Sequence, residues 1–197
     1  YTMSQAEIES FDCGTKFHPN FPEQQKIKTI KPLLKDVIKL VPEIKRKRIL
    51  FEIKSDKPEY GISQPFPKEY AALILNEVKD YGLGSILYMS FDPTILEELY
   101  KLDPSLRLVY LSENKSLKRD LKSLSFKPFG LGMYYATLNP RKMKTLRKMK
   151  LGVYAWTVNE VKDAQRMMDL GIDGIITDYP RRVIQVRGTY SSKPKRF

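Results

Sequence analysis

The chain has 197 residues, 42% of them hydrophobic, and a net charge of +12. This length favours one domain with a real core, and the charge favours anionic ligands. The single cysteine, Cys13, excludes a framework of internal disulfides. The sequence contains no apolar run of about 18 residues, so we expect no integral membrane segment. No signal peptide is recognisable, but the chain begins with Tyr1, so we expect a processed or shortened N-terminus.

The basic residues are spread through the chain. Their densest run, Lys45–Arg48, lies where a helix is expected to end before a strand. Cations are favoured at the C-terminal ends of helices, so the run is explained as a solvated helix end. The last residues, Ser191–Phe197, indicate a frayed basic tail. No segment interleaves basic and aromatic residues in the way that stacks nucleic-acid bases, so we expect no nucleic-acid partner.

The first 31 residues are polar and irregular. A short helix is predicted over Ser4–Ser10, with Ser4 and Glu7 forming a capping box. Phe11–Lys31 contains a glycine and two prolines and is predicted to be a surface loop. It holds the only histidine of the sequence, His18, and a lone loop histidine is most often simply exposed.

From Pro32 onward the pattern becomes regular. A helix is predicted from Pro32 to Leu40, and later helical patterns include Lys68–Tyr81 and one that follows Asn159, its expected N-cap. Apolar runs that predict strands are Ile49–Lys54, Ser85–Phe91, Arg107–Leu111, Phe129–Tyr134, Gly152–Val158 and Ile172–Thr177. Strict alternation of strands and helices predicts a parallel sheet covered by helices.

Most predicted strands run into polar residues at their C-terminal ends. These residues are Glu52, Lys54, Ser55, Ser90, Asp92, Ser112, Glu113, Asn114, Thr157, Asn159, Thr177 and Asp178. A ring of polar groups at this end is typical of α/β-barrel active sites. A doubly wound sheet would collect its ligand at one crevice, and no glycine-rich nucleotide motif supports that alternative. A barrel needs eight strands, so we expect two βα units to be missing at the N-terminal end.

The stretch Ile49–Ser55 places two charges on an otherwise apolar strand. Because side chains alternate between faces, Glu52 and Lys54 share a face with Leu50, while Phe51 and Ile53 point the other way. The residues alone leave two interpretations open: an ion pair inside the sheet, or a metal or phosphate site at a strand end.

Four motifs in register carry a resemblance to a known family. They are Phe51-Glu52-Ile53-Lys54, Ser90-Phe91-Asp92, Trp156-Thr157-Val158-Asn159 and Gly171 to Pro180. The chain resembles the glycerophosphodiester phosphodiesterase (GDPD) family, bacterial type, over essentially all of residues 4–182. The resemblance implies a TIM (β/α)8 barrel of the phospholipase C-like phosphodiesterase type. About six of eight units lie in residues 1–182, and a helix end and basic tail in residues 183–197.

The resemblance also implies a chemistry. Members hydrolyse glycerophosphodiesters to glycerol 3-phosphate and an alcohol, using two histidines and a divalent cation, Ca²⁺ or Mg²⁺. Carried over, Glu52 matches a metal-ligand carboxylate and Lys54 a residue that meets the phosphate. Phe91 and Trp156 match apolar walls near the glycerol, although core packing explains Trp156 as well. Met89 stands where the family pattern has glutamine.

The pattern departs from the family at its start. A His-Arg-Gly motif, a Glu-x-Asp metal pair and a His-Asp motif are expected, and none is present. We therefore expect this chain to be catalytically inactive as it stands. Alternatives are a non-catalytic remnant or anion-binding module, a phospholipase D-like barrel, and a Schiff-base enzyme using Lys54. The resemblance favours a periplasmic or secreted location, with the cytoplasm as alternative, and leaves the oligomeric state open.

Overall fold

The computed structural model describes residues 2–113 and 116–190. Within them, six parallel strands form one sheet in sequence order. The strands are β1 (Arg48–Glu52), β2 (Ser85–Ser90), β3 (Arg107–Ser112), β4 (Gly130–Tyr134), β5 (Gly152–Trp156) and β6 (Gly174–Ile175). All six predicted strands are therefore found, and β1 ends two residues before Lys54.

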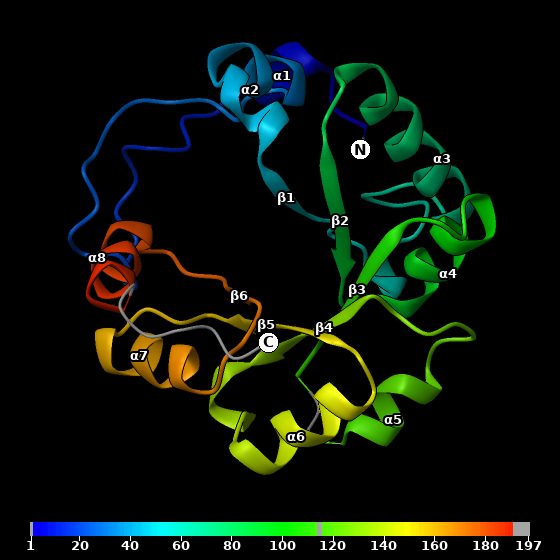
Figure 1. Cartoon of the computed structure of the whole chain (residues 1–197). Coiled ribbons are helices and arrows are strands. Elements are labelled where there is room, and N and C mark those ends of the chain that lie inside the picture. The colour runs from blue at the N-terminus through cyan, green and yellow to red at the C-terminus, as the bar shows by residue number, and fades with distance from the viewer. Residues whose placement is uncertain (1, 114–115, 191–197) are drawn as a thin grey trace.

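Helices follow the strands around the outside of the curved sheet, as Figure 1 shows. The helices are α1 (Gln5–Glu9), α2 (Leu34–Leu40), α3 (Pro67–Val78), α4 (Pro93–Leu102), α5 (Leu117–Lys122), α6 (Pro140–Lys148), α7 (Val161–Asp169) and α8 (Pro180–Tyr190). Parallel strands in sequence order, joined by outer helices, form part of an α/β barrel. The predicted six-unit portion of such a barrel is confirmed.

Side-chain alternation along the strands separates two apolar clusters. Phe51 and Ile53 belong to the larger cluster, which lies between the sheet and the outer helices. Leu50 packs into the smaller cluster inside the curve, which includes Leu87 and Tyr154. The predicted alternation of Ile49–Ser55 is thus confirmed, and it directs Glu52 to the inner face.

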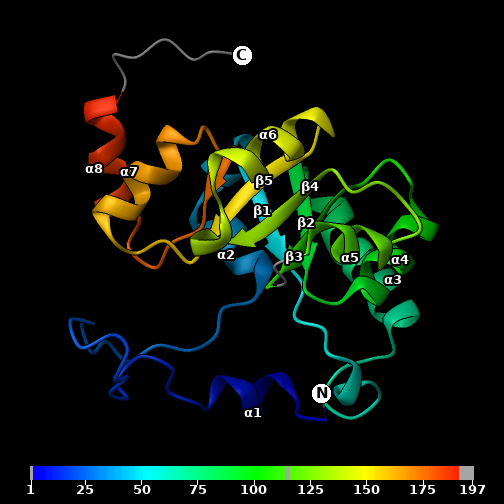
Figure 2. The ribbon, with the colours of Figure 1, turned by 90° about the horizontal axis from the view of Figure 1, so that it is seen from below.

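The N-terminal segment crosses the opening between β1 and β6. In Figure 1 the chain runs from α1 to the vicinity of α8 and returns to α2. Figure 2 shows this segment on the side of the molecule where the loop after β1 emerges. Glu23 accepts a hydrogen bond from Arg182 at 2.8 Å, and the rings of Phe21 and Tyr179 lie 6.4 Å apart. These contacts hold the loop against the start of α8.

The helix ends confirm several predictions and correct two. Ser4 and Glu7 form the predicted capping box. The helix expected from Pro32 begins at Leu34, because Leu33 keeps an extended backbone. Asn159 is not the N-cap of α7; Glu160 is, because the Asn159 side chain bonds across to the end of β6.

Predictions for the C-terminal part of the chain can be compared with the structure as far as residue 190. The expected boundary at residue 182 falls inside α8, where Val183 packs on the larger apolar cluster. The predicted tail Ser191–Phe197 and the strand-end residue Asn114 lie outside the described residues. In the described part of the chain, no helix is both long and apolar enough to cross a membrane.

We expect the 197-residue chain to self-associate in solution. Within the described residues, β1 and β6 each pair with only one strand, so each presents an edge that another chain can extend. Sedimentation velocity at increasing concentration should show species heavier than the monomer. A monodisperse monomer that melts in one cooperative transition would contradict this expectation.

Candidate functional site

Glu52 and Lys54 form an ion pair at the C-terminal end of β1. The Lys54 ammonium lies 2.6 Å from Glu52 Oε1, and the side chains are 81% and 29% exposed, respectively. The pair is therefore not buried inside the sheet, which removes the first of the two interpretations left open by the sequence. Exposed pairs of this kind contribute at most about 1 kcal/mol, so stability alone does not explain it.

An aromatic wall stands at the same end of the sheet. The rings of Phe91 and Trp156 lie 5.1 Å apart, edge to face. Phe91 follows β2 and Trp156 ends β5, so the contact reaches across strands that are not neighbours. Tyr134, the last residue of β4, lies 5.7 Å from Trp156 and is 41% exposed.

Tyr134 was missed by sequence reasoning, although a signal existed. Tyr134 lies two residues after Gly132 on β4, so both residues point to the inner face of the sheet. A Cβ on Gly132 would meet Leu111 at 2.2 Å, and its next nearest neighbours include Trp156 at 3.6 Å. The indole Nε1 of Trp156 is buried and has no hydrogen-bond partner among the described residues. The wall therefore combines exposed rings with one unused donor.

A buried network fixes the loop that follows Lys54. Asp92 is 9% exposed and accepts hydrogen bonds from the hydroxyls of Ser55 and Tyr60. It also accepts from the Thr94 N–H at 2.8 Å and so caps α4. Burial, and next the bond to Asp92, raise the pKa of Tyr60. The network ties the segment beyond β1 to the start of α4.

Asn159 and Met89 lie near strand ends and have different structural roles. Asn159 accepts bonds from Thr177 Oγ1 and the Asp178 N–H and donates to Asp178 at 2.9 Å, so these residues brace the loops after β5 and β6. Met89 lies opposite Glu52 in the sheet register, but it is 5% exposed and packs in the inner cluster. Met89 therefore contributes packing inside the curve.

His18 is exposed within the N-terminal loop. Its Nδ1 accepts the Asn20 N–H, and its ring lies 4.9 Å from that of Phe21. Both contacts are made inside the loop itself. In the described part of the chain, no group of three or more His, Cys, Asp or Glu side chains could hold a metal ion. A single carboxylate already paired with Lys54 does not by itself fit a divalent cation.

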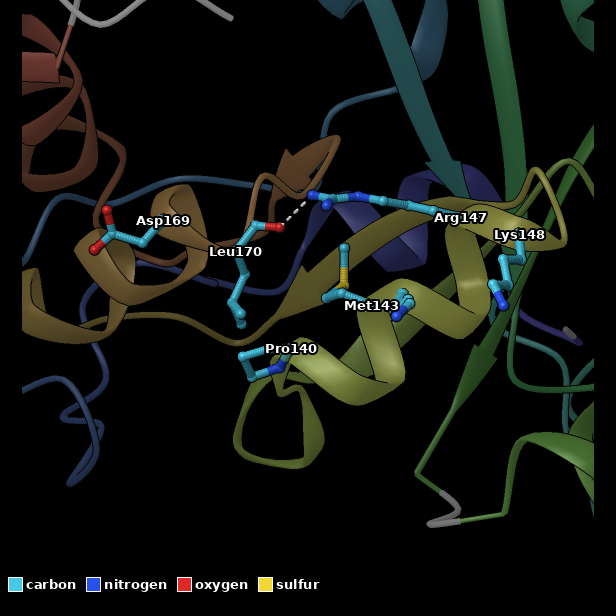
Figure 3. A pocket seen from close by; sticks show the side chains of 7 residues that line it. Pro140, Met143, Arg147, Lys148, Asp169 and Leu170 are labelled. Carbon is cyan, nitrogen blue, oxygen red and sulfur yellow. Dashed lines mark hydrogen bonds between the residues drawn. The ribbon is translucent and has the colours of Figure 1, made fainter. Parts of the chain in front are cut away.

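A pocket of about 630 Å³ lies on the outer side of the fold, between α6 and α7. Figure 3 shows Arg147 reaching from α6 to the end of α7, where its Nη2 donates to the Leu170 carbonyl at 2.5 Å. Met143 and Pro140 give the pocket an apolar floor. Arg147 thus ties two helices together, and the pocket lies apart from the strand ends that carry Glu52 and Trp156.

The curved parallel sheet, with polar and aromatic side chains at its C-terminal strand ends, has the architecture of α/β-barrel proteins, in which this end carries the active site. The sequence pattern of the Glycerophosphoryl diester phosphodiesterase family matches residues 2–182. The chain belongs to this family, and the resemblance drawn from the four motifs is confirmed.

Relatives and solved structures agree with this assignment. The chain is 27% identical to a glycerophosphodiester phosphodiesterase of Bacillus subtilis, covering 94% of this chain and 64% of that protein. A Silicibacter pomeroyi structure assigned to the same family has a TM-score of 0.82 at 28% identity, covering 96% of this chain and 69% of that one. An Oleispira antarctica phosphodiesterase, solved with its product sn-glycerol-3-phosphate, shares the fold with a TM-score of 0.75 at 19% identity, over 95% and 72% of the two chains. The chain thus spans about two thirds of the length of these proteins.

Proposed function

We propose that this chain serves glycerophosphodiester hydrolysis by binding the phosphate and glycerol moieties of the substrate. The observation that carries the proposal is the arrangement at one end of the sheet. The exposed ammonium of Lys54 and the aromatic contact between Phe91 and Trp156 both stand there. We also propose that residues 1–182 form the barrel portion responsible for this binding.

The chemistry of each group fits a different part of the substrate. Lys54 is a compact cation that neutralises phosphate oxygens without demanding a fixed bidentate geometry. The faces of Phe91 and Trp156 pack against the carbon chain of a glycerol and exclude water from it. Together these groups bind and orient an anionic polyol.

Glu52 is proposed as one carboxylate of a Ca²⁺ or Mg²⁺ site. Such a site needs several oxygen ligands, and among the described residues Glu52 belongs to no group of three that could hold a metal ion. A pair of proton-transferring histidines is likewise incomplete, because the sequence contains one histidine. Glu52 and Lys54 therefore represent one side of a site.

Binding is tested with the only tryptophan of the chain, Trp156, as an intrinsic fluorescence probe. Titration with glycerol 3-phosphate should change its emission in a saturable way. Lys54→Gln should weaken this binding about tenfold, because a charge-assisted contact is lost. Lys144→Gln, an equal change of charge on the outer face of α6, should bind like the parent chain. Equal affinities of the Lys54→Gln variant and the parent would refute the proposed role of Lys54.

A non-catalytic anion-binding module is the second candidate function. It is favoured by the same Lys54, together with the absence of a second histidine from the sequence. A Schiff-base role is disfavoured, because Lys54 is 81% exposed and ion-paired with Glu52, whereas an amine nucleophile is activated in a desolvated apolar pocket. Borohydride trapping with a carbonyl substrate should accordingly leave Lys54 unmodified.

A further inference from the structure

A second pocket, of about 560 Å³, opens at the opposite end of the sheet. Its lining includes Arg48 at the start of β1, Lys127 and Phe129 just before β4, and Lys150 just before β5. Because all six strands are parallel, residues that precede them meet at their N-terminal ends. The pocket is therefore separated by the length of the sheet from Lys54 and Trp156.

Its charges are mostly positive and uncompensated. Among the described residues, Arg48, Lys127 and Lys150 make no ion pair with a carboxylate. The one acidic residue of the lining, Asp173, accepts the backbone N–H of Val153 at 2.8 Å. The lining therefore carries three cations and one carboxylate, a net positive charge.

A fourth cation and a hydroxyl border the same space. The guanidinium of Arg107 lies 5.8 Å from the ring centre of Phe129 and donates to Ser85 Oγ at 3.0 Å. Burial raises the pKa of Tyr154 most, and Asp173 raises it further, whereas Arg48 and Arg107 act in the opposite direction. Both guanidinium groups thus lie within electrostatic reach of the Tyr154 hydroxyl, which would be a neutral donor beside them.

The backbone at Lys150 is unusual. It follows the end of α6 with φ 54°, in the left-handed region, and the Leu151 N–H bonds back to the Leu146 carbonyl at 3.2 Å. At the matching position after α7 the chain has Gly171, with φ 67° and the same bonding pattern. Glycine is the favoured residue there, and a lysine is disfavoured by its Cβ. The lysine therefore occupies, against the local backbone preference, a position that lines the pocket.

The surrounding sequence is rich in positive charge. Residues 113–150 contain eleven basic and two acidic residues, which accounts for nine of the net +12. One of the two acidic residues, Asp120, is 1% exposed and bonded to Ser112, so it does not reach the surface. The last turn of α6, which leads to Lys150 and β5, adds Arg147 and Lys148 at this end of the sheet, so the potential there is positive.

We propose that this pocket binds a small soluble ligand of the phosphate-ester or pyrophosphate class, carrying two or more negative charges. The phosphate oxygens would be bound by Arg48, Lys127 and Lys150, and the ring of Phe129 would pack against the ligand. The pocket volume suits a compact ligand rather than a polymer. The ring of Tyr154 is 2% exposed and cannot stack a nucleic-acid base.

The test is calorimetric titration of the 197-residue chain with inorganic pyrophosphate at low ionic strength. We expect saturable binding that weakens about tenfold in Lys150→Gly and in Arg48→Gln, as expected for loss of one charge-assisted hydrogen bond. Lys150→Gly should melt at or above the temperature of the parent chain, because glycine prefers the left-handed conformation, so its weaker binding cannot reflect unfolding. The emission of Trp156, at the other end of β5, should not change.

The matched control is Lys68→Gln at the start of α3, an equal loss of charge at the other end of the sheet. It should retain the parent affinity. Equal weakening in Lys68→Gln would show that only net charge matters and would overturn the proposal. Absence of saturable binding in the millimolar range would overturn it as well. So would binding to phosphatidic acid vesicles without any response to free pyrophosphate, since the pocket would then not recognise a soluble ligand.

Discussion

Incubation of the 197-residue chain with glycerophosphocholine and either Ca²⁺ or Mg²⁺ should release no glycerol 3-phosphate above the blank. Family members use two histidines for proton transfer, and each group of this kind contributes about 10²–10⁴-fold to a rate. This chain has only His18, whose contacts lie within its own loop. In the described part of the chain, Glu52 belongs to no group of three or more side chains that could hold a metal ion. A phosphorus NMR time course measures the product directly.

Two further measurements make this expectation decisive. The Bacillus subtilis relative, assayed in parallel, is the positive control for substrate and metal. His18→Gln is the informative variant of this chain, because His18 is the only histidine. Hydrolysis by the parent chain that disappears in His18→Gln would show that the N-terminal loop brings His18 to the strand ends. The placement of His18 outside the site would then be wrong.

The fold was predictable because its signals are local and repeat. Most strands are apolar runs that lead into polar residues, and each helix carries its own pattern between them. Gly82 and Gly171 mark helix ends, and both have the positive φ angles expected there, 62° and 67°. The alternation of Phe51, Glu52 and Ile53 assigned faces correctly, because a strand has a period of two. None of these inferences requires knowledge of distant contacts.

The rest of the site depends on contacts between distant segments. Asp92 was recognisable as a polar strand-end residue, but its bonds to Ser55 and Tyr60 span 37 and 32 residues. Tyr134 joins the aromatic wall because β4 pairs with β5 in a register that sets it beside Trp156. Asn159 follows a good helix-capping pattern, yet the end of β6 competes successfully for its side chain. Local patterns cannot resolve such competition.

Replacement of Asp92 by alanine should cause the largest loss of stability that we predict for a single substitution in this chain. The change removes the N-cap of α4 and leaves the hydroxyls of Ser55 and Tyr60 without their acceptor. A lost cap and two lost bonds to a mostly buried carboxylate together lower the free energy of unfolding by about 3 kcal/mol. With a urea slope of about 2 kcal/mol/M, the midpoint should fall by about 1.5 M.

Two companion variants separate the carboxylate from the rest of the site. Asp92→Asn keeps an oxygen for the Thr94 N–H and should lose less stability than Asp92→Ala, because only the hydroxyl acceptor changes. Lys54→Gln should leave the urea midpoint unchanged, because Lys54 is exposed and its pair with Glu52 contributes little. If Asp92→Ala unfolds at the parent midpoint, the loop after β1 is not held by this network. If Asp92→Ala unfolds at a lower urea concentration than the parent and Lys54→Gln does not, then Asp92 maintains the geometry around Lys54. In that case the folded Asp92→Asn variant should also bind glycerol 3-phosphate more weakly than the parent.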